Sequence, residues 1–141
     1  MDVILPPLAP KFDSFLGGDM NLQGKCKVLR IYADEDIKWN NQLLYRAIVE
    51  KLLKAGLAGA TVFKGIEGFG SSARIHSARI LEITENLPVM VEVVDSPKQI
   101  LKALNAVEPM LPKHCLVTVQ DVRVLHYHVA QGGHKKTKKL S

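Results

Sequence analysis

Residues 89–111 read VMVEVVDSPKQILKALNAVEPML, a strand that is followed at once by a helix. The first seven residues are rich in valine, which favours strands. Ser96 is a candidate N-cap, Pro97 suits the first helical position, and Gln99 completes a capping box. Pro109 cannot continue a helix, so we expect the helix to end just before it. The stretch therefore predicts a β-strand and then an α-helix that begins after Ser96.

The segments on either side also read as strands and helices, from the two-residue period of strands and the 3.6-residue period of helices. The predicted strands cover residues 25–34, 58–66, 89–95 and 115–128. The predicted helices cover residues 40–56 and 96–108. Asn40 or Asn41 can cap the first helix, and Gly56 ends it. The alternation of the last strand changes phase around Gln120 and Asp121, which predicts a bulge or a break there. The order strand, helix, strand, strand, helix, strand is ferredoxin-like. Because such crossovers are right-handed, we expect an α+β fold with a four-stranded antiparallel sheet and both helices on one face.

The two strands that should lie at the centre of this sheet are apolar on both faces. They read VLRIYA (28–33) and VMVEVV (89–94), and Glu92 is the main polar residue of the second run. A sheet with one solvated face alternates more clearly between apolar and polar residues. We therefore expect another subunit to cover the face that the helices leave open, which predicts an oligomer.

Composition limits the class of protein. The chain has 141 residues, of which 47% are hydrophobic, and this suits one globular domain. No apolar run approaches the ~20 residues that span a bilayer, and the N-terminus lacks the basic start of a signal peptide. We therefore expect a cytoplasmic protein with reduced thiols. Cys26 and Cys115 begin neighbouring antiparallel strands, which places them at opposite ends of the pair, so no disulfide is expected.

Three parts are expected along the chain. Residues 1–24 contain several prolines and no sustained period, so we expect a flexible N-terminal arm. Residues 25–129 form the predicted domain. Residues 130–141 include four lysines in the run HKKTKK (134–139) and form a basic tail. The net charge of +5 comes mostly from this tail, which is typical of a solvated chain end, and no nucleic-acid partner is expected.

A long, glycine-rich connection joins the second and third strands. About 20 residues separate Ile66 from Val89, whereas hairpin loops commonly have about 2–5. The connection contains FKGIEGFGSSARIH (63–76), in which successive glycine N–H groups can converge on an anion, while Lys64, Arg74 and the following Arg79 add charge. It is neither a Rossmann GxGxxG nor a Walker GK[ST] motif. Composition alone favours a flexible turn, and an anion-binding loop stays open beside it.

Other candidate chemistries have weaker support. Ser71 and Ser72 lie outside a GxSxG elbow. The acidic run at residues 34–36 is more typical of a turn than of a metal or acid–base site. His126 and His128 share one face of the last strand, and a transition metal would need a further histidine beside them. These patterns favour a non-catalytic protein with no metal site.

The runs GATVFKGIEGFG (59–70) and ENLPVMVEVVDS (85–96), with His76 between them, resemble the PII-like family catalogued as Domain of Unknown Function 190. The resemblance covers about residues 25–127. It implies a ferredoxin-like homotrimer of the PII/CutA superfamily, in which the long connection is a T-loop, a mobile effector arm. By this resemblance the T-loop base and its nucleotide-binding role fall on Lys64, Gly65, Gly68, Phe69, Gly70, Arg74 and His76.

One segment departs from the PII pattern. PII proteins carry a second glycine-rich phosphate loop, of the TGxxGDGK kind, before the last strand, and this chain reads EPMLPKHCL (108–116) there. The segment has no glycine, and Lys113 or His114 is the positive contact that it offers. ATP binding in the PII manner would lack its second phosphate loop here, and a smaller or different effector stays open.

Together these features predict a PII-like signalling protein. We expect an adenine nucleotide (AMP, ADP or ATP) to bind as an effector at intersubunit clefts near the loop base, with no obligatory cofactor. Binding would order or release the loop, which would then regulate a partner such as a membrane transporter, since members of the family often sit near ion transporters. Two alternatives stay open: a CutA-like metal-binding trimer that uses His76, His126 and His128, and a small nucleotide-hydrolysing enzyme.

Overall fold

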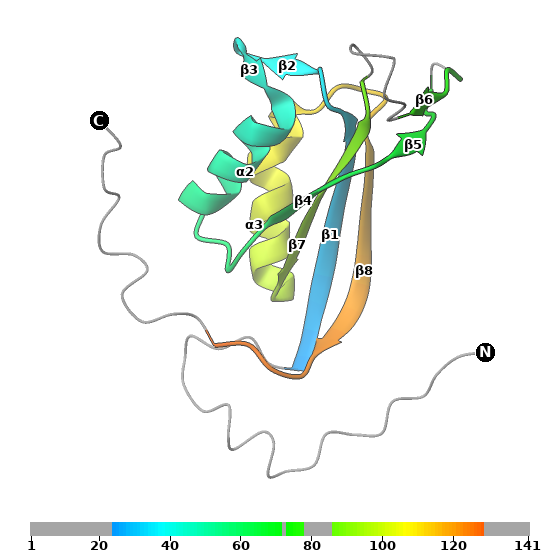
Figure 1. Cartoon of the computed structure of the whole chain (residues 1–141). Helices are drawn as coiled ribbons and strands as arrows, with labels where there is room; N and C mark the ends of the chain where they lie inside the picture. The colour runs from blue at the N-terminus through cyan, green and yellow to red at the C-terminus, as the bar shows by residue number, and fades with distance from the viewer. Residues whose placement is uncertain (1–23, 72, 78–85, 129–141) are drawn as a thin grey trace, which may run out of the picture.

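The computed structural model describes residues 24–71, 73–77 and 86–128 (Figure 1). The predicted N-terminal arm and basic tail lie outside these residues, apart from Gly24, which is the first residue of a strand. The main sheet is antiparallel, has the strand order β4-β7-β1-β8, and consists of β4 (Thr61–Lys64), β7 (Pro88–Asp95), β1 (Gly24–Asp34) and β8 (Leu116–Val124). The helices α2 (Leu44–Lys54) and α3 (Pro97–Val107) lie on one face of the sheet (Figure 1). The predicted ferredoxin-like α+β fold is therefore confirmed.

The core lies between this helical layer and one face of the sheet. Along β7 every second side chain is buried, as expected for a strand whose successive side chains point to opposite faces. Leu29 and Ile31 of β1 are fully buried against the helices. The core side chains are Leu29, Ile31, Leu44, Ala47, Ile48, Leu52, Leu57, Val91, Val93, Ile100, Ala103, Val107 and Met110.

The predicted cap of the first helix is wrong. Asn40 and Asn41 have φ of 46° and 64° and form the turn of a small hairpin between β2 (Lys38–Trp39) and β3 (Gln42–Leu43). Asparagine tolerates this left-handed conformation better than most residues, so the pair serves a tight turn instead of a cap. The helix begins four residues later than the earliest residue of the prediction, and Leu43 occupies its N-cap position without a side-chain hydrogen bond.

Both helix ends that were predicted from glycine and proline are confirmed. Gly56 follows α2 with a φ of 82°, and its N–H donates to the carbonyl of Leu53 at 3.1 Å. Helix α3 ends at Val107, and a 3₁₀ turn, η1 (Glu108–Met110), contains Pro109.

The capping box of α3 is half formed. Ser96 Oγ accepts a hydrogen bond from the backbone N–H of Gln99 at 3.3 Å, as predicted for an N-cap. The side chain of Gln99, however, donates to the carbonyl of Gly56 at 3.1 Å. In a full capping box the Gln99 side chain would accept the N–H of Ser96. Here the carboxylate of Asp95 accepts that N–H at 2.7 Å. The two helices are therefore linked at the end where α2 finishes and α3 begins.

The predicted bulge or break in β8 is also wrong. The pairing of β1 with β8 runs without interruption from Gly24↔Val124 to Tyr32↔Leu116. The change of phase in the sequence arises because the apolar residues move from one face of the sheet to the other halfway along the strand. Val117 packs against the helical core, whereas Val122 and Val124 point to the opposite face.

That opposite face, which we call the open face, carries Cys26, Val28, Arg30 and Tyr32 of β1 and the side chains paired with them. Its middle is polar, since Arg30 Nε donates to Glu92 at 3.0 Å and Arg30 Nη1 donates to Gln120 at 2.9 Å. One end is apolar and half-exposed, and its row across the sheet is Phe63, Met90, Tyr32 and Leu116.

The other end of the open face lies beneath residues 125–128, which we call the crossing segment. It leaves β8 at one edge of the sheet, and Tyr127 OH donates to the carbonyl of Ala58, just before β4 at the other edge, at 3.0 Å. The turn of the chain below the sheet is visible in Figure 1. Cys26 and Val28 at this end are only 3% and 4% exposed. The crossing segment therefore narrows the part of the open face that another subunit can reach.

The two cysteines lie at opposite ends of β1, as predicted. Cys26 is paired with Val122, whereas Cys115 contacts the backbone of Tyr32, and both thiols are free. Among the described residues, no helix is both long and apolar enough to cross a membrane.

Candidate functional site

The long connection leaves the edge strand β4 at Lys64 and returns as β7 at Pro88. Its described part contains a short hairpin, β5 (Glu67–Gly68) paired with β6 (His76–Ser77), which the sequence did not predict. Residues 78–85, which include Arg79, lie outside the described residues. The predicted length of the connection is confirmed by the positions where β4 ends and β7 begins.

The glycines at the loop base allow close packing against Pro88. The N–H of Gly65 donates to the carbonyl of Pro88 at 2.7 Å. A Cβ added to Gly65 would lie 2.7 Å from Pro88 Cγ, and one added to Gly68 would lie 3.2 Å from the same atom. None of Gly65, Gly68 and Gly70 has a φ in the left-handed region. The expected convergence of N–H groups through positive φ is therefore absent here, and two of these glycines serve close approach instead.

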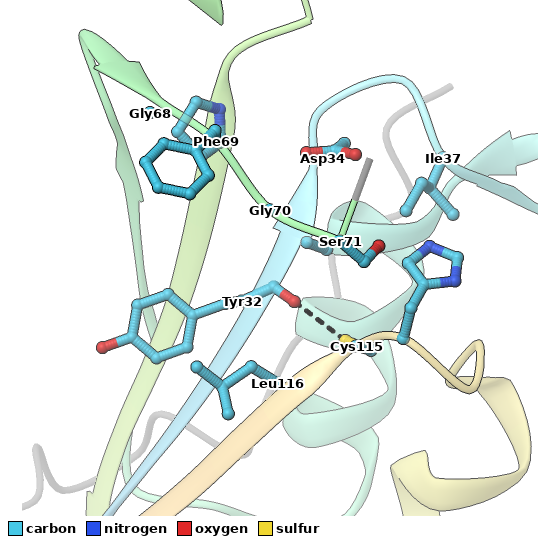
Figure 2. A pocket seen from close by; sticks show the side chains of 12 residues that line it. Tyr32, Asp34, Ile37, Gly68, Phe69, Gly70, Ser71, Cys115 and Leu116 are labelled. Atoms are coloured by element: carbon cyan, nitrogen blue, oxygen red, sulfur yellow. Dashed lines mark hydrogen bonds between the residues drawn. The ribbon is translucent and has the colours of Figure 1, made fainter. Parts of the chain in front are cut away.

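A hollow of about 200 Å³ lies beside this loop (Figure 2). Three parts of the chain that are distant in sequence form it: the end of β1, the glycine-rich loop, and the start of β8. Its lining residues are Tyr32, Ala33, Asp34, Ile37, Gly68, Phe69, Gly70, Ser71, Pro88, His114, Cys115 and Leu116. The topology brings these parts together because β1 and β8 are antiparallel neighbours, so that the end of one meets the start of the other.

The three residues of the acidic run that follows β1, residues 34–36, make different contacts. Glu35 forms an ion pair with Lys64 Nζ at 2.9 Å, and Asp36 accepts a hydrogen bond from Asn86 at 2.7 Å. Asp34 lines the hollow, and its carboxylate makes no hydrogen bond or ion pair with any residue that the structure describes. Its two acceptor oxygens are thus available to a molecule in the hollow.

Cys115 contributes a neutral thiol to the hollow. Its Sγ–H donates to the carbonyl of Tyr32 at 2.9 Å (Figure 2). Burial raises the pKa of the Cys115 thiol, and the negative charge of Asp34 raises it further. The thiol is therefore a poor nucleophile at neutral pH. Of the described residues that line the hollow, His114 is the one that can carry a positive charge.

The structure brings together part of the predicted site. Gly68, Phe69 and Gly70 line the hollow. Lys64 is paired with Glu35, and Gly65 packs on Pro88, so neither of them lines it. Arg74 is exposed and also stands apart from the lining. The backbone of His76 pairs with Gly68, while its side chain lies outside what the structure describes.

Sequence reasoning missed the wall of the hollow that the sheet supplies. Tyr32, Asp34, Cys115 and Leu116 all belong to strand ends and carry no motif. The predicted antiparallel pairing of the first and last strands was the available signal, because it places these ends together.

The histidines that support the metal alternative form a pair. The rings of His126 and His128 are 5.1 Å apart between centroids and meet edge to face. Within residues 24–71, 73–77 and 86–128 there is no group of three or more His, Cys, Asp or Glu side chains that could hold a metal ion.

Comparisons with solved structures identify the fold. CPII, a nitrogen regulatory PII-like protein from Thiomonas intermedia K12 bound to ADP, AMP and bicarbonate, matches with a TM-score of 0.55 and 20% identity over 72% of this chain and 90% of its own. The same protein bound to ADP and bicarbonate matches with a TM-score of 0.54 and 19% identity over the same shares of the two chains. At this level of identity the likeness establishes a shared PII-like fold.

Sequence comparisons identify the family. The UPF0166 proteins of Aquifex aeolicus and Methanocaldococcus jannaschii are each 34% identical to this chain. The match covers 72% of this chain and 95% of the first relative, and 71% of this chain and 92% of the second. The sequence profile of Domain of Unknown Function 190, described as "Uncharacterized ACR", matches residues 26–124. The chain belongs to the Domain of Unknown Function 190 family.

Proposed function

We propose that this chain is a PII-like regulatory protein that binds an adenine nucleotide, AMP, ADP or ATP, at the hollow beside the glycine-rich loop. One observation carries the proposal: the hollow is built jointly from the long connection and the rigid end of the sheet. A ligand held there contacts both parts, so binding changes the freedom of the loop. The PII-like protein CPII, which shares the fold, was solved with ADP and AMP bound.

In this proposal the working unit is a homotrimer, and the ligand binds between subunits. The hollow of about 200 Å³ is smaller than the ~300–1,000 Å³ of most small-molecule pockets, so a second subunit is needed to complete it. The apolar row of the open face borders the hollow, since Tyr32 and Leu116 belong to both. Phe63 and Leu116 in this row are 47% and 58% exposed in the single chain, which favours contact with another copy.

Sedimentation of paired variants tests the assembly. Leu116→Asp places a charge in the apolar row and is expected to dissociate the oligomer. Leu53→Asp is the matched control, because Leu53 is 72% exposed on α2, on the far side of the sheet from the row. A monodisperse monomer for the unchanged protein would contradict this part of the proposal.

The regulatory step is an order–disorder change of the loop. Ligand in the hollow orders residues 68–71, and the loop beyond them presents or withdraws a surface for a partner, such as a membrane transporter. The protein acts in the cytoplasm without catalysing a reaction. Within the proposed T-loop base, Gly68, Phe69 and Gly70 line the hollow and contact the nucleotide, while Lys64, Gly65, Arg74 and His76 form the rest of the loop base.

Calorimetry tests nucleotide binding directly. AMP, ADP, ATP and cyclic AMP are titrated into the protein and into Phe69→Ala and Ile66→Ala. Phe69 is 74% exposed and lines the hollow, whereas Ile66, in the same loop and 79% exposed, does not. Loss of an aromatic face that stacks on a base is expected to weaken binding by about tenfold in Phe69→Ala only. Absence of heat with every nucleotide, in a folded protein, would refute the function.

A further inference from the structure

The charges around the hollow determine which part of a nucleotide enters it. We infer that the hollow takes the nucleoside part through hydrogen bonds to Asp34, and that the phosphates remain outside. Affinity is then set by the nucleoside and changes little with the number of phosphates. This inference rests on the proposed function and specifies the ligand chemistry of the same site.

The first observation is the absence of lysine and arginine among the described residues that line the hollow. Its ionisable groups are the Asp34 carboxylate, the His114 imidazole and the thiol of Cys115, together with the phenol of Tyr32. Lys64, at the start of the glycine-rich loop, is held by Glu35 at 2.9 Å. Within one subunit, a phosphate in the hollow would lie beside a carboxylate, and no described lysine or arginine of the lining would offset the repulsion.

The second observation is that Asp34 alone of the acidic run is left without a partner among the described residues. The carboxylates of Glu35 and Asp36 are engaged by Lys64 and Asn86. An ionised carboxylate accepts hydrogen bonds and donates none. The ligand group that it recognises must therefore be a donor, which in an adenine nucleoside is either the ribose hydroxyls or the 6-amino group.

The third observation is the apolar wall of the hollow. In Figure 2 the rings of Tyr32 and Phe69 lie on one side of the view, and Asp34 and Ile37 lie on the other. A planar base can rest on the aromatic side while a donor group of the ligand reaches the carboxylate. The arrangement of an apolar surface with one aimed polar group is typical of sites that fix the orientation of an uncharged ring.

Titration of adenosine, AMP, ADP and ATP into the full chain tests the inference. We expect dissociation constants that agree within about tenfold, since the favourable contacts of the hollow do not reach the phosphates. Nucleotides that bind while the affinity rises by about tenfold or more with each added phosphate would overturn the inference and leave the proposed function intact. Absence of binding by all four ligands would overturn both.

Substitution of Asp34 gives a second, independent readout. Asp34→Ala is expected to weaken adenosine binding by about tenfold or more, because a hydrogen bond to a charged acceptor is lost. Asp36→Ala removes a carboxylate from the same turn, outside the hollow, and should leave binding within about twofold of the unchanged protein. Asp34→Asn keeps the shape of the side chain and removes the charge, so it should raise the affinity for ATP relative to adenosine.

Two analogues identify the donor group. 2′,3′-Dideoxyadenosine lacks the ribose hydroxyls, and purine riboside lacks the 6-amino group. The analogue without the true donor should bind weakly to the unchanged protein and show no further loss in Asp34→Ala. If both analogues lose as much affinity in Asp34→Ala as adenosine does, Asp34 does not accept the hydrogen bond and the inference is wrong. Circular dichroism of each variant confirms that the fold is retained.

Discussion

The two glycines at the ends of the run GIEGFG should respond in opposite ways to the addition of a methyl group. In Gly65→Ala the new Cβ would lie 2.7 Å from Pro88 Cγ and 3.3 Å from the carbonyl oxygen of Pro88. The loop cannot retreat freely, because the N–H of Gly65 already donates to that carbonyl at 2.7 Å. Around Gly70 no atom lies within 4 Å of the added Cβ.

The expected magnitude follows from two terms. Replacement of glycine by alanine reduces the entropy of the unfolded chain and stabilises by about 0.4–1 kcal/mol where the native conformation allows it. Overpacking against a rigid neighbour costs about 1–3 kcal/mol. The first term is common to both variants, so Gly65→Ala should be less stable than Gly70→Ala by about 1–3 kcal/mol.

Urea denaturation followed by circular dichroism measures this difference. The two variants are compared at one protein concentration, since assembly adds a concentration-dependent term to stability. Equal slopes with urea would show that the midpoint shift reports folding free energy. A difference below about 0.5 kcal/mol would refute the close-packing role of Gly65, because it falls short of the overpacking cost. Retention of fold and loss of ligand binding in Gly65→Ala would instead show that the loop base can shift.

Further predictions concern the buried carboxylate, the thiol in the hollow and the crossing segment. Asp95 is 3% exposed and accepts the N–H groups of Ala58 and Ser96 at 2.8 and 2.7 Å, so Asp95→Ala should lower the free energy of unfolding by about 3–5 kcal/mol, measured with urea and compared with the exposed Asp121→Ala. A loss no larger than that of the control would contradict this role. Folding raises the pKa of Cys115, so the neutral thiol stabilises the fold below the ordinary thiol pKa of about 8.5, and this stabilisation is lost as the pH rises through the higher pKa of the folded protein. Iodoacetamide at pH 8 should therefore modify Cys115 more slowly than a free cysteine. An equal rate would contradict the raised pKa. Tyr127→Phe removes one hydrogen bond to a backbone carbonyl and should cost about 0.5–1.5 kcal/mol, whereas no change in the urea midpoint would show that the contact adds nothing.

The sequence predicted the elements of this fold well where the local signals were strong. The valine-rich β7, the Ser96 cap and the Gly56 end all follow from preferences of single residues. The failures came where one residue type serves two roles. Asn40 suits both a cap and a tight turn, and the hairpin used the turn. A change of phase in β8 marks either a bulge or a change of buried face, and packing decided between them.

The candidate site could be predicted from the loop and from His114, which the sequence offered as a positive contact and which lines the hollow. Glycines in a long connection are visible as a pattern, and Gly68 and Gly70 do line the hollow. Asp34 and Cys115 carry no motif, and their importance depends on the contact between two strand ends. Whether Glu35 or Asp34 takes the lysine of the loop is decided by side-chain geometry, which no sequence pattern encodes.

The crossing segment has a consequence for the choice of domain boundaries. The family profile ends at residue 124, so a fragment cut to the profile would lose residues 125–128 and the hydrogen bond from Tyr127 to Ala58. That contact joins the two outer strands of the sheet by a route separate from the strand pairing. A recombinant fragment, or a fusion at the C-terminus, should therefore retain the chain through His128. A fragment that ends at residue 124 lacks the Tyr127 hydrogen bond between the two edges of the sheet. The family profile alone does not reveal this contact.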